Sequence, residues 1–177
     1  MREPIPIVAY DRAWPRMFEA ERDGIRAVLG ALALRIDHHG STSVPGLAAK
    51  PVIDIQISVR QLHPIEAYEH LLARIGYVHV PHPDDAFCPY FHRPAAWPHT
   101  HHVHVVRHGG DEERRTLAFR DYLREHEDER RAYEDLKRGL AGCFGANEPS
   151  SQQAYADAKT DFITRITERA LAAGYPR

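Results

Sequence analysis

The chain has 177 residues, with 23 Lys or Arg, 25 Asp or Glu and 13 His, so its formal net charge at pH 7 is −2 with neutral imidazoles. This length predicts one domain over residues 1–177, and a hydrophobic fraction of 43% can fill one sizeable core. The near-neutral charge argues against a nucleic-acid partner bound through bulk electrostatics.

The sequence also lacks the usual signals for membranes and secretion. No stretch approaches the ~18 apolar residues that span a bilayer, and charged residues interrupt the N-terminus before the apolar core of a signal peptide could form. Cys88 and Cys143 belong to no CxxC pattern, which is typical of reduced thiols. We therefore expect a cytoplasmic protein with no membrane partner.

Hydrophobic periodicity predicts a mixed sheet followed by helices. In chain order it indicates a short strand at 7–10, a helix opening near Pro15, strands at 32–39 and 52–59, a helix at 63–75, and strands at 77–80, 87–93 and 101–107. Charged helical segments follow at 112–125, 127–144 and 151–172. The predicted fold class is α+β, with a sheet core over about 1–110 and a helical C-terminal part over about 111–177.

A loop rich in small residues, 40–51, leads into the strand that carries Asp54. Gly40 allows close backbone approach, so a phosphate could rest on exposed N–H groups and on the hydroxyl of Ser41 or Ser43. Lys50 could supply positive charge, and Asp54 an oxygen ligand for a hard cation. Alternatively the loop is a simple turn and Asp54 a hydrogen-bonded strand residue. The isoleucines around Asp54 favour a paired carboxylate, because a lone buried charge is costly.

Histidines gather at two places in the predicted sheet. His102 and His104 are two residues apart on one strand and therefore share a face, where they could bind one metal ion or one phosphate. His38 and His39 lead directly into the glycine-serine loop. A polar strand face is the alternative for the His102 pair, and Val106 excludes the histidine-triad motif. Seven others are expected to be ordinary surface residues: His63, His70, His79, His82, His92, His108 and His126.

Basic residues on the C-terminal helices could close over a phosphate if their helices pack across the sheet. They are Arg120, Arg124, Lys137 and Lys159. The charges on these helices alternate in sign, which is also typical of a solvated face with salt bridges. Their spacing does not choose among them.

Several strings resemble the GrpB family, in order and over nearly the whole chain. HHGSTSVPGLAAKPVIDI (38–55) is long and rare. The others are HHVHVV (101–106), FRDYLR (119–124), Tyr133 with Leu136 and Lys137, and Tyr155 with KTDFI (159–163).

The resemblance implies a fold of the nucleotidyltransferase superfamily, and some bacterial dephospho-CoA kinases carry such a domain. That superfamily has a Gly-Ser turn, then paired acids on the next strand and a third acid on a later strand. Gly40, Ser41 and Asp54 match the first parts of this pattern. Gln56 stands at the position of the partner acid, and the later strand offers histidines.

Three functional hypotheses follow. In the first, the protein transfers a nucleotidyl or phosphoryl group, with Asp54 and His104 as catalytic residues and with Asp54, His102 and His104 holding a divalent ion, Mn²⁺, Mg²⁺ or Zn²⁺. In the second, it is a non-catalytic module that binds a nucleotide or CoA-type ligand and assists a partner, for which dephospho-CoA kinase is the analogue. The third is a histidine metal hydrolase unrelated to nucleotides. The residues expected to contact the ligand are Gly40, Ser41, Ser43, Lys50, Gln56, Lys137 and Lys159.

Overall fold

The computed structural model describes residues 3–146 and 149–177, so four positions of the predicted single domain lie outside the described residues. Its centre is a five-stranded sheet in the order β1-β2-β5-β4-β3. The strands are β1 (Arg35–His39), β2 (Ile53–Val59), β3 (Val78–His79), β4 (Tyr90–Arg93) and β5 (His101–Arg107). β2 and β5 are parallel, and every other neighbouring pair is antiparallel.

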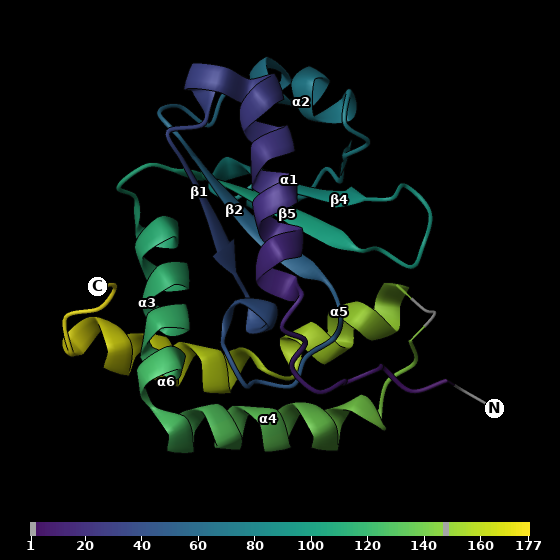
Figure 1. Ribbon diagram of the computed structural model, residues 1–177, viewed down its shortest axis with the longest axis vertical. Helices are drawn as coiled ribbons and strands as arrows, with labels where there is room; N and C mark the ends of the chain where they lie inside the picture. Colours follow the sequence, from purple (N-terminus) through teal and green to yellow (C-terminus); the bar gives the residue numbers. More distant parts are fainter. Residues whose placement is uncertain (1–2, 147–148) are drawn as a thin grey trace.

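The described residues form six α-helices beside this sheet (Figure 1). They are α1 (Trp14–Leu29), α2 (Glu66–Ala73), α3 (Asp111–Glu125), α4 (Glu127–Ala141), α5 (Pro149–Asp157) and α6 (Thr160–Ala172). α1 crosses one face of the sheet, while α3 to α6 form a separate helical part at one end of it (Figure 1). This arrangement confirms the predicted α+β class with a C-terminal helical segment.

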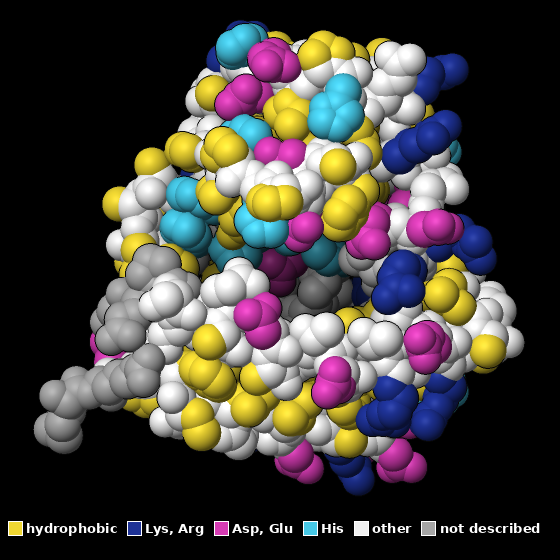
Figure 2. Space-filling view, turned by 180° about the vertical axis from the view of Figure 1, so that it is seen from behind, with side chains coloured by type: hydrophobic (Ala, Val, Ile, Leu, Met, Phe, Trp, Pro, Cys, Tyr) yellow, Lys and Arg dark blue, Asp and Glu magenta, His cyan; other side chains and the backbone are white. Residues whose placement is uncertain are grey.

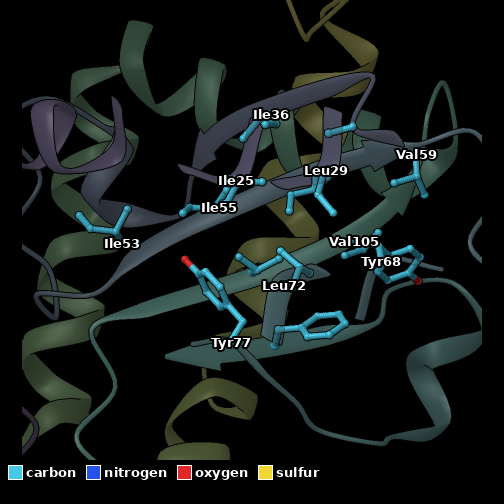
Figure 3. Packing of buried hydrophobic residues seen from close by; sticks show 14 of the residues in the cluster. Ile25, Leu29, Ile36, Ile53, Ile55, Val59, Tyr68, Leu72, Tyr77 and Val105 are labelled. Carbon is cyan, nitrogen blue, oxygen red and sulfur yellow. The ribbon is translucent and has the colours of Figure 1, made fainter. Parts of the chain in front are cut away.

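The main core lies between α1, α2 and the apolar face of the sheet (Figure 3). Alternation along β2 places Ile53, Ile55 and Ile57 on this face, each fully buried. Ile25 and Leu29 of α1 pack against them. Because the apolar residues of β2 all point to this side, its polar residues must point to the opposite face.

A second core fixes the glycine-serine loop to the helical part. Val44 and Leu47 of the loop pack with Tyr122 and Leu123 of α3 and with Ile166 of α6. Burial of each such side chain stabilises the folded state by about 1.5–3 kcal/mol. The loop is therefore held by packing at its centre, although it contains no strand and only one short 3₁₀ turn, Ser41–Ser43.

The structure corrects the predicted elements at two places. Residues 7–10 form no strand of the sheet, because Val8 pairs only with Ala49 in an isolated bridge. The helix predicted at 151–172 is divided into α5 and α6 by a turn at Ala158 and Lys159. The two halves bury side chains in different clusters, Tyr155 with Ile5 and Ala141, and Ile166 with α3, so one straight helix could not serve both.

Two expectations about location can be compared with the described residues. In residues 3–146 and 149–177, no helix is both long and apolar enough to cross a bilayer. Cys88 and Cys143 are both free thiols, as their spacing predicted.

Candidate functional site

The polar face of the sheet brings the predicted site residues together. Strand register places Asp54 beside His39 of β1 and His102 of β5, and it places Gln56 beside His104. Seen from this side, histidine side chains gather around a hollow in the surface (Figure 2). The alternation of β2 and β5 predicted this face, and the parallel pairing of the two strands aligns their polar residues.

Asp54 is the acidic centre of this face. Its Oδ1 lies 3.3 Å from Nδ1 of His102. Burial alone would raise the pKa of Asp54, but the hydrogen bond from His102 and the nearby imidazoles lower it well below its usual range. Asp54 is therefore a carboxylate at neutral pH, oriented by a neighbouring ring.

The glycine-serine turn packs directly on this carboxylate. Gly40 has a φ of +65°, and a Cβ built on it would lie 2.3 Å from Oδ2 of Asp54. Only glycine can occupy this position, both for the backbone conformation and for the contact. Ser41 hydrogen-bonds with Tyr133 of α4, which connects the turn to the helical part.

Three lysines from distant parts of the chain interact electrostatically with Asp54 and form what we call the lysine cluster: Lys50, Lys137 and Lys159. Lys137 is 2% exposed and donates a hydrogen bond to the carbonyl of Ala48. Lys50 Nζ lies 3.1 Å from Oε1 of Gln152. Within the described chain, Lys159 has neither a hydrogen bond nor an ion pair, and its Nζ lies 4.1 Å from the centre of the Tyr155 ring.

Electrostatics shows that the lysine cluster is short of negative charge. Burial, then repulsion from Lys159, lowers the pKa of Lys137 to about 7. Burial, then repulsion from Lys50, lowers the pKa of Lys159 to about 8. The pKa of Lys50 is also lowered by burial, although Asp54 opposes the shift. Asp54 raises the pKa of all three lysines and Glu134 raises that of Lys137, but burial outweighs both carboxylates, and a bound anion would relieve the cost of the buried positive charge.

The other polar groups of this face are mostly neutral and incompletely hydrogen-bonded. Burial lowers the pKa of His39 to about 3 and that of His104 to about 4, so both rings are uncharged at pH 7. Gln56 is fully buried, and neither atom of its amide has a partner among the described residues. The same holds for Nε2 of His39 and of His102.

Comparison with known proteins places the chain in a family. A family model described as "GrpB protein" matches residues 4–169. The chain belongs to the GrpB family. A UPF0157 protein of Halalkalibacterium halodurans is 40% identical over 170 residues, which cover 95% of this chain and 83% of that protein. A second UPF0157 protein, from Pseudomonas aeruginosa, is 38% identical over 172 residues, covering 96% and 69%.

A solved structure confirms the fold of this GrpB-family chain. The crystal structure of the conserved protein GrpB from Enterococcus faecalis matches with a TM-score of 0.83 and 34% identity, covering 95% of this chain and 98% of that chain. A dephospho-CoA kinase of Mycolicibacterium paratuberculosis is 32% identical over 161 residues, which cover 77% of this chain and 40% of that enzyme. The predicted family and its nucleotidyltransferase-like fold agree with these findings.

The residues predicted to hold a metal ion do not form a group of three ligands in the described part of the chain. Among residues 3–146 and 149–177, no three His, Cys, Asp or Glu side chains are grouped as metal ligands. Asp54 is the one carboxylate of the predicted set, and His102 already bonds it through Nδ1. Hard divalent cations prefer several oxygen ligands. The predicted set of Asp54, His102 and His104 therefore stays a prediction.

Several predicted residues lie away from the lysine cluster. His38 points to the other face and stacks on Phe18 with ring centres 4.8 Å apart. The Ser43 hydroxyl donates a hydrogen bond to the carbonyl of Gly40, with an Oγ to O distance of 2.6 Å. Ser43 also lines a separate cavity of about 300 Å³ beside α1, together with Arg120 and Arg124. Asp54 raises the pKa of Lys137 and of Lys159, whereas Arg120 pairs with Asp37 and Asp121.

Sequence reasoning overlooked several aromatic residues around the site. Tyr133 and Tyr155 lie on the charged helices predicted from the sequence, and no pattern predicts a role for Trp97. Tyr133 and Tyr155 each lie four residues before the lysine that they contact, so helical spacing could have found them, whereas Trp97 becomes relevant only through its contact with the distant Lys50. The surface assignment of His92 was wrong, since its side chain is 9% exposed and stacks on His99 with ring centres 3.7 Å apart. It was wrong for His79 as well, whose side chain is 11% exposed and pairs with Asp85.

Proposed function

We propose that this GrpB-family protein binds the phosphate groups of a nucleotide or another phosphorylated small molecule at the lysine cluster. The observation that carries the proposal is the convergence of three lysines with lowered pKa beside the Gly40 turn, with Asp54 as their acidic neighbour. Buried ammonium groups destabilise a protein unless an anion accompanies them. Phosphates carry several charges and acceptor oxygens, and would therefore pair with all three.

A role in binding rather than transfer is supported by the residues beside Asp54. Two-metal phosphoryl transfer needs several carboxylates to hold Mg²⁺, and Gln56 and His104 stand at the positions where acids would be expected. The partial similarity to dephospho-CoA kinases also favours a module that assists a partner enzyme. Transfer chemistry is the competing outcome, and it would require turnover that depends on Asp54.

Titration calorimetry with sodium tripolyphosphate tests the binding proposal directly. Lys137→Met and Lys159→Met should each weaken binding by about tenfold or more, since each removes one buried charge pair with the ligand. Arg131→Met is the matched control, because Arg131 lies on the same helix as Lys137 but is exposed and pairs with Glu127. Equal affinity in the lysine variants and the wild type would contradict the proposal.

A turnover assay separates binding from transfer. Wild type and Asp54→Asn are incubated with ATP and Mn²⁺ or Mg²⁺, and the nucleotide products are quantified. Binding without turnover is the expected result. Metal-dependent consumption of ATP by the wild type that Asp54→Asn abolishes would instead establish the transfer reaction.

A further inference from the structure

The segment between β4 and β5 carries two aromatic side chains that the core does not use. Along 94–100 five residues are exposed, whereas Trp97 and His99 are half-buried. Trp97 belongs to neither of the large hydrophobic clusters. A tryptophan kept partly in water forgoes much of the ~25 cal/mol per Å² that burial would contribute, so its place at this edge calls for another explanation.

Trp97 and His99 lie directly beside the lysine cluster. Nζ of Lys50 is 5.6 Å from the centre of the Trp97 ring. The Trp97 ring meets His99 edge-on, with ring centres 4.8 Å apart, and His99 is 5.6 Å from His102. Lys50 therefore connects the aromatic pair to the lysine cluster, and His102 connects it to Asp54.

The His99 ring is held in place by the ring of His92. His99 stacks almost parallel on the buried His92, with ring centres 3.7 Å apart and an angle of 10°. Burial, then the charges of His92, His102 and Lys50, lowers the pKa of His99 to about 4, so its ring is neutral at pH 7. A fixed, uncharged ring next to a half-exposed indole is a surface on which a planar heterocycle can stack.

We infer that Trp97 and His99 form the subsite for the base of a nucleotide whose phosphates occupy the lysine cluster. The inference rests on the proposed function and narrows it, from any phosphorylated molecule to one with a planar heteroaromatic group next to its phosphates. In a nucleotide the sugar joins these two parts, and Lys50 lies where the two subsites meet. The alternative is that Trp97 only holds Lys50 through the cation–π contact.

Fluorescence gives the first test, because the chain contains two tryptophans and Trp14 is 3% exposed. In Trp14→Phe, Trp97 is the sole reporter, and ATP should quench its emission markedly, whereas tripolyphosphate should change it little. Trp97→Phe retains Trp14 and should show no quenching by either ligand. Absence of ATP quenching in a Trp14→Phe protein that binds ATP by calorimetry would overturn the inference.

Calorimetry gives the second test and separates the two proposals. Trp97→Ala should weaken ATP binding by about tenfold, within the range for loss of one base–aromatic stack, and should leave tripolyphosphate binding unchanged. Trp97→Phe keeps a ring and should retain most of the ATP affinity. Equal weakening of both ligands by Trp97→Ala would show that Trp97 only positions Lys50. If the wild type binds ATP no more tightly than tripolyphosphate, the base subsite is contradicted but the proposed function is not. If the wild type binds neither ligand, the proposed function is contradicted as well.

Discussion

Two basic clusters lie in different parts of the molecule, and they differ in how completely their charges are satisfied. On the α1 side, Arg120 donates to Asp121 at 2.6 Å and to the carbonyl of His38 at 3.1 Å. Arg124 donates twice to the carbonyl of Ser43, at 3.1 and 2.8 Å. The lysine cluster of Lys50, Lys137 and Lys159 has Asp54 as its shared acidic neighbour, and Glu134 acts on Lys137 as well.

The difference indicates separate roles for the two clusters. The planar guanidinium groups are occupied by the protein's own acceptors, and they fix the glycine-serine loop to α3. The lysines are desolvated, and Lys137 and Lys50 donate to neutral acceptors, the Ala48 carbonyl and the Gln152 amide, so burial lowers their pKa and disfavours the unliganded state. A region that destabilises its own fold in this way is typical of a binding site, because a ligand can supply the missing charge.

The largest expected effect comes from breaking the satisfied cluster. Arg120→Met should lower the free energy of unfolding by about 3–5 kcal/mol, because it removes one partner of a buried ion pair and leaves the His38 carbonyl without its donor. Urea denaturation measures this loss, with Arg131→Met as the surface control. Tripolyphosphate affinity should stay at the wild-type value in Arg120→Met under conditions where it is folded. A loss of affinity equal to that of Lys137→Met would mean that the two clusters act as one site.

The next largest effect concerns the glycine turn that packs on Asp54. Gly40→Ala combines a positive φ with a contact of 2.3 Å to Oδ2 of Asp54, and should destabilise the fold by about 3 kcal/mol. Gly46→Ala is the matched control, because Gly46 has a φ of +79° but nothing within 4 Å of its built Cβ. The control should lose only about 1–2 kcal/mol from backbone strain. Equal losses in urea denaturation would show that the contact with Asp54 contributes nothing.

The two faces of the sheet, the glycine-serine turn and several helices were predictable from local sequence patterns. Alternation along 52–59 and 101–107 identified both faces of the sheet, and the Gly-Ser string with Asp54 located the turn and the carboxylate. Hydrophobic periodicity likewise placed α1, α3 and the start of α4 within one or two residues of their observed bounds. These features depend on neighbours in the chain, which a single sequence records.

The composition of each cluster was not predictable in the same way. Arg120, Arg124, Lys137 and Lys159 are all basic positions on charged helices, and only packing decides that the first two lie on the α1 side. The break between α5 and α6 was equally invisible, since no Gly or Pro marks it. The break allows Tyr155 and Ile166, on either side of it, to pack in two different hydrophobic clusters.

A smaller effect is expected from the acid within the lysine cluster. Asp54→Asn should strengthen tripolyphosphate binding up to about tenfold without metal, because it removes the charge that competes with the ligand for the lysines. The native carboxylate has a lowered pKa, so it stabilises the fold above the unfolded value near pH ~4, and that contribution disappears as pH falls through the folded value. Calorimetry with and without Mn²⁺ measures the affinities. Weaker binding by the variant only when Mn²⁺ is present would identify Asp54 as a metal ligand.

The smallest effect is a pH dependence of stability that comes from the lowered pKa of Lys137. The folded pKa of Lys137 is about 7 and its unfolded value 10.5, so between these values the unfolded chain binds more protons and the wild type gains stability as pH rises. Relative to Lys137→Met, we expect a gain of about 1 kcal/mol from pH 7 to pH 8, measured by urea denaturation. Saturating tripolyphosphate should abolish that gain, because a bound anion restores the pKa of Lys137. An identical pH slope in wild type and variant, without ligand, would show that Lys137 is not desolvated.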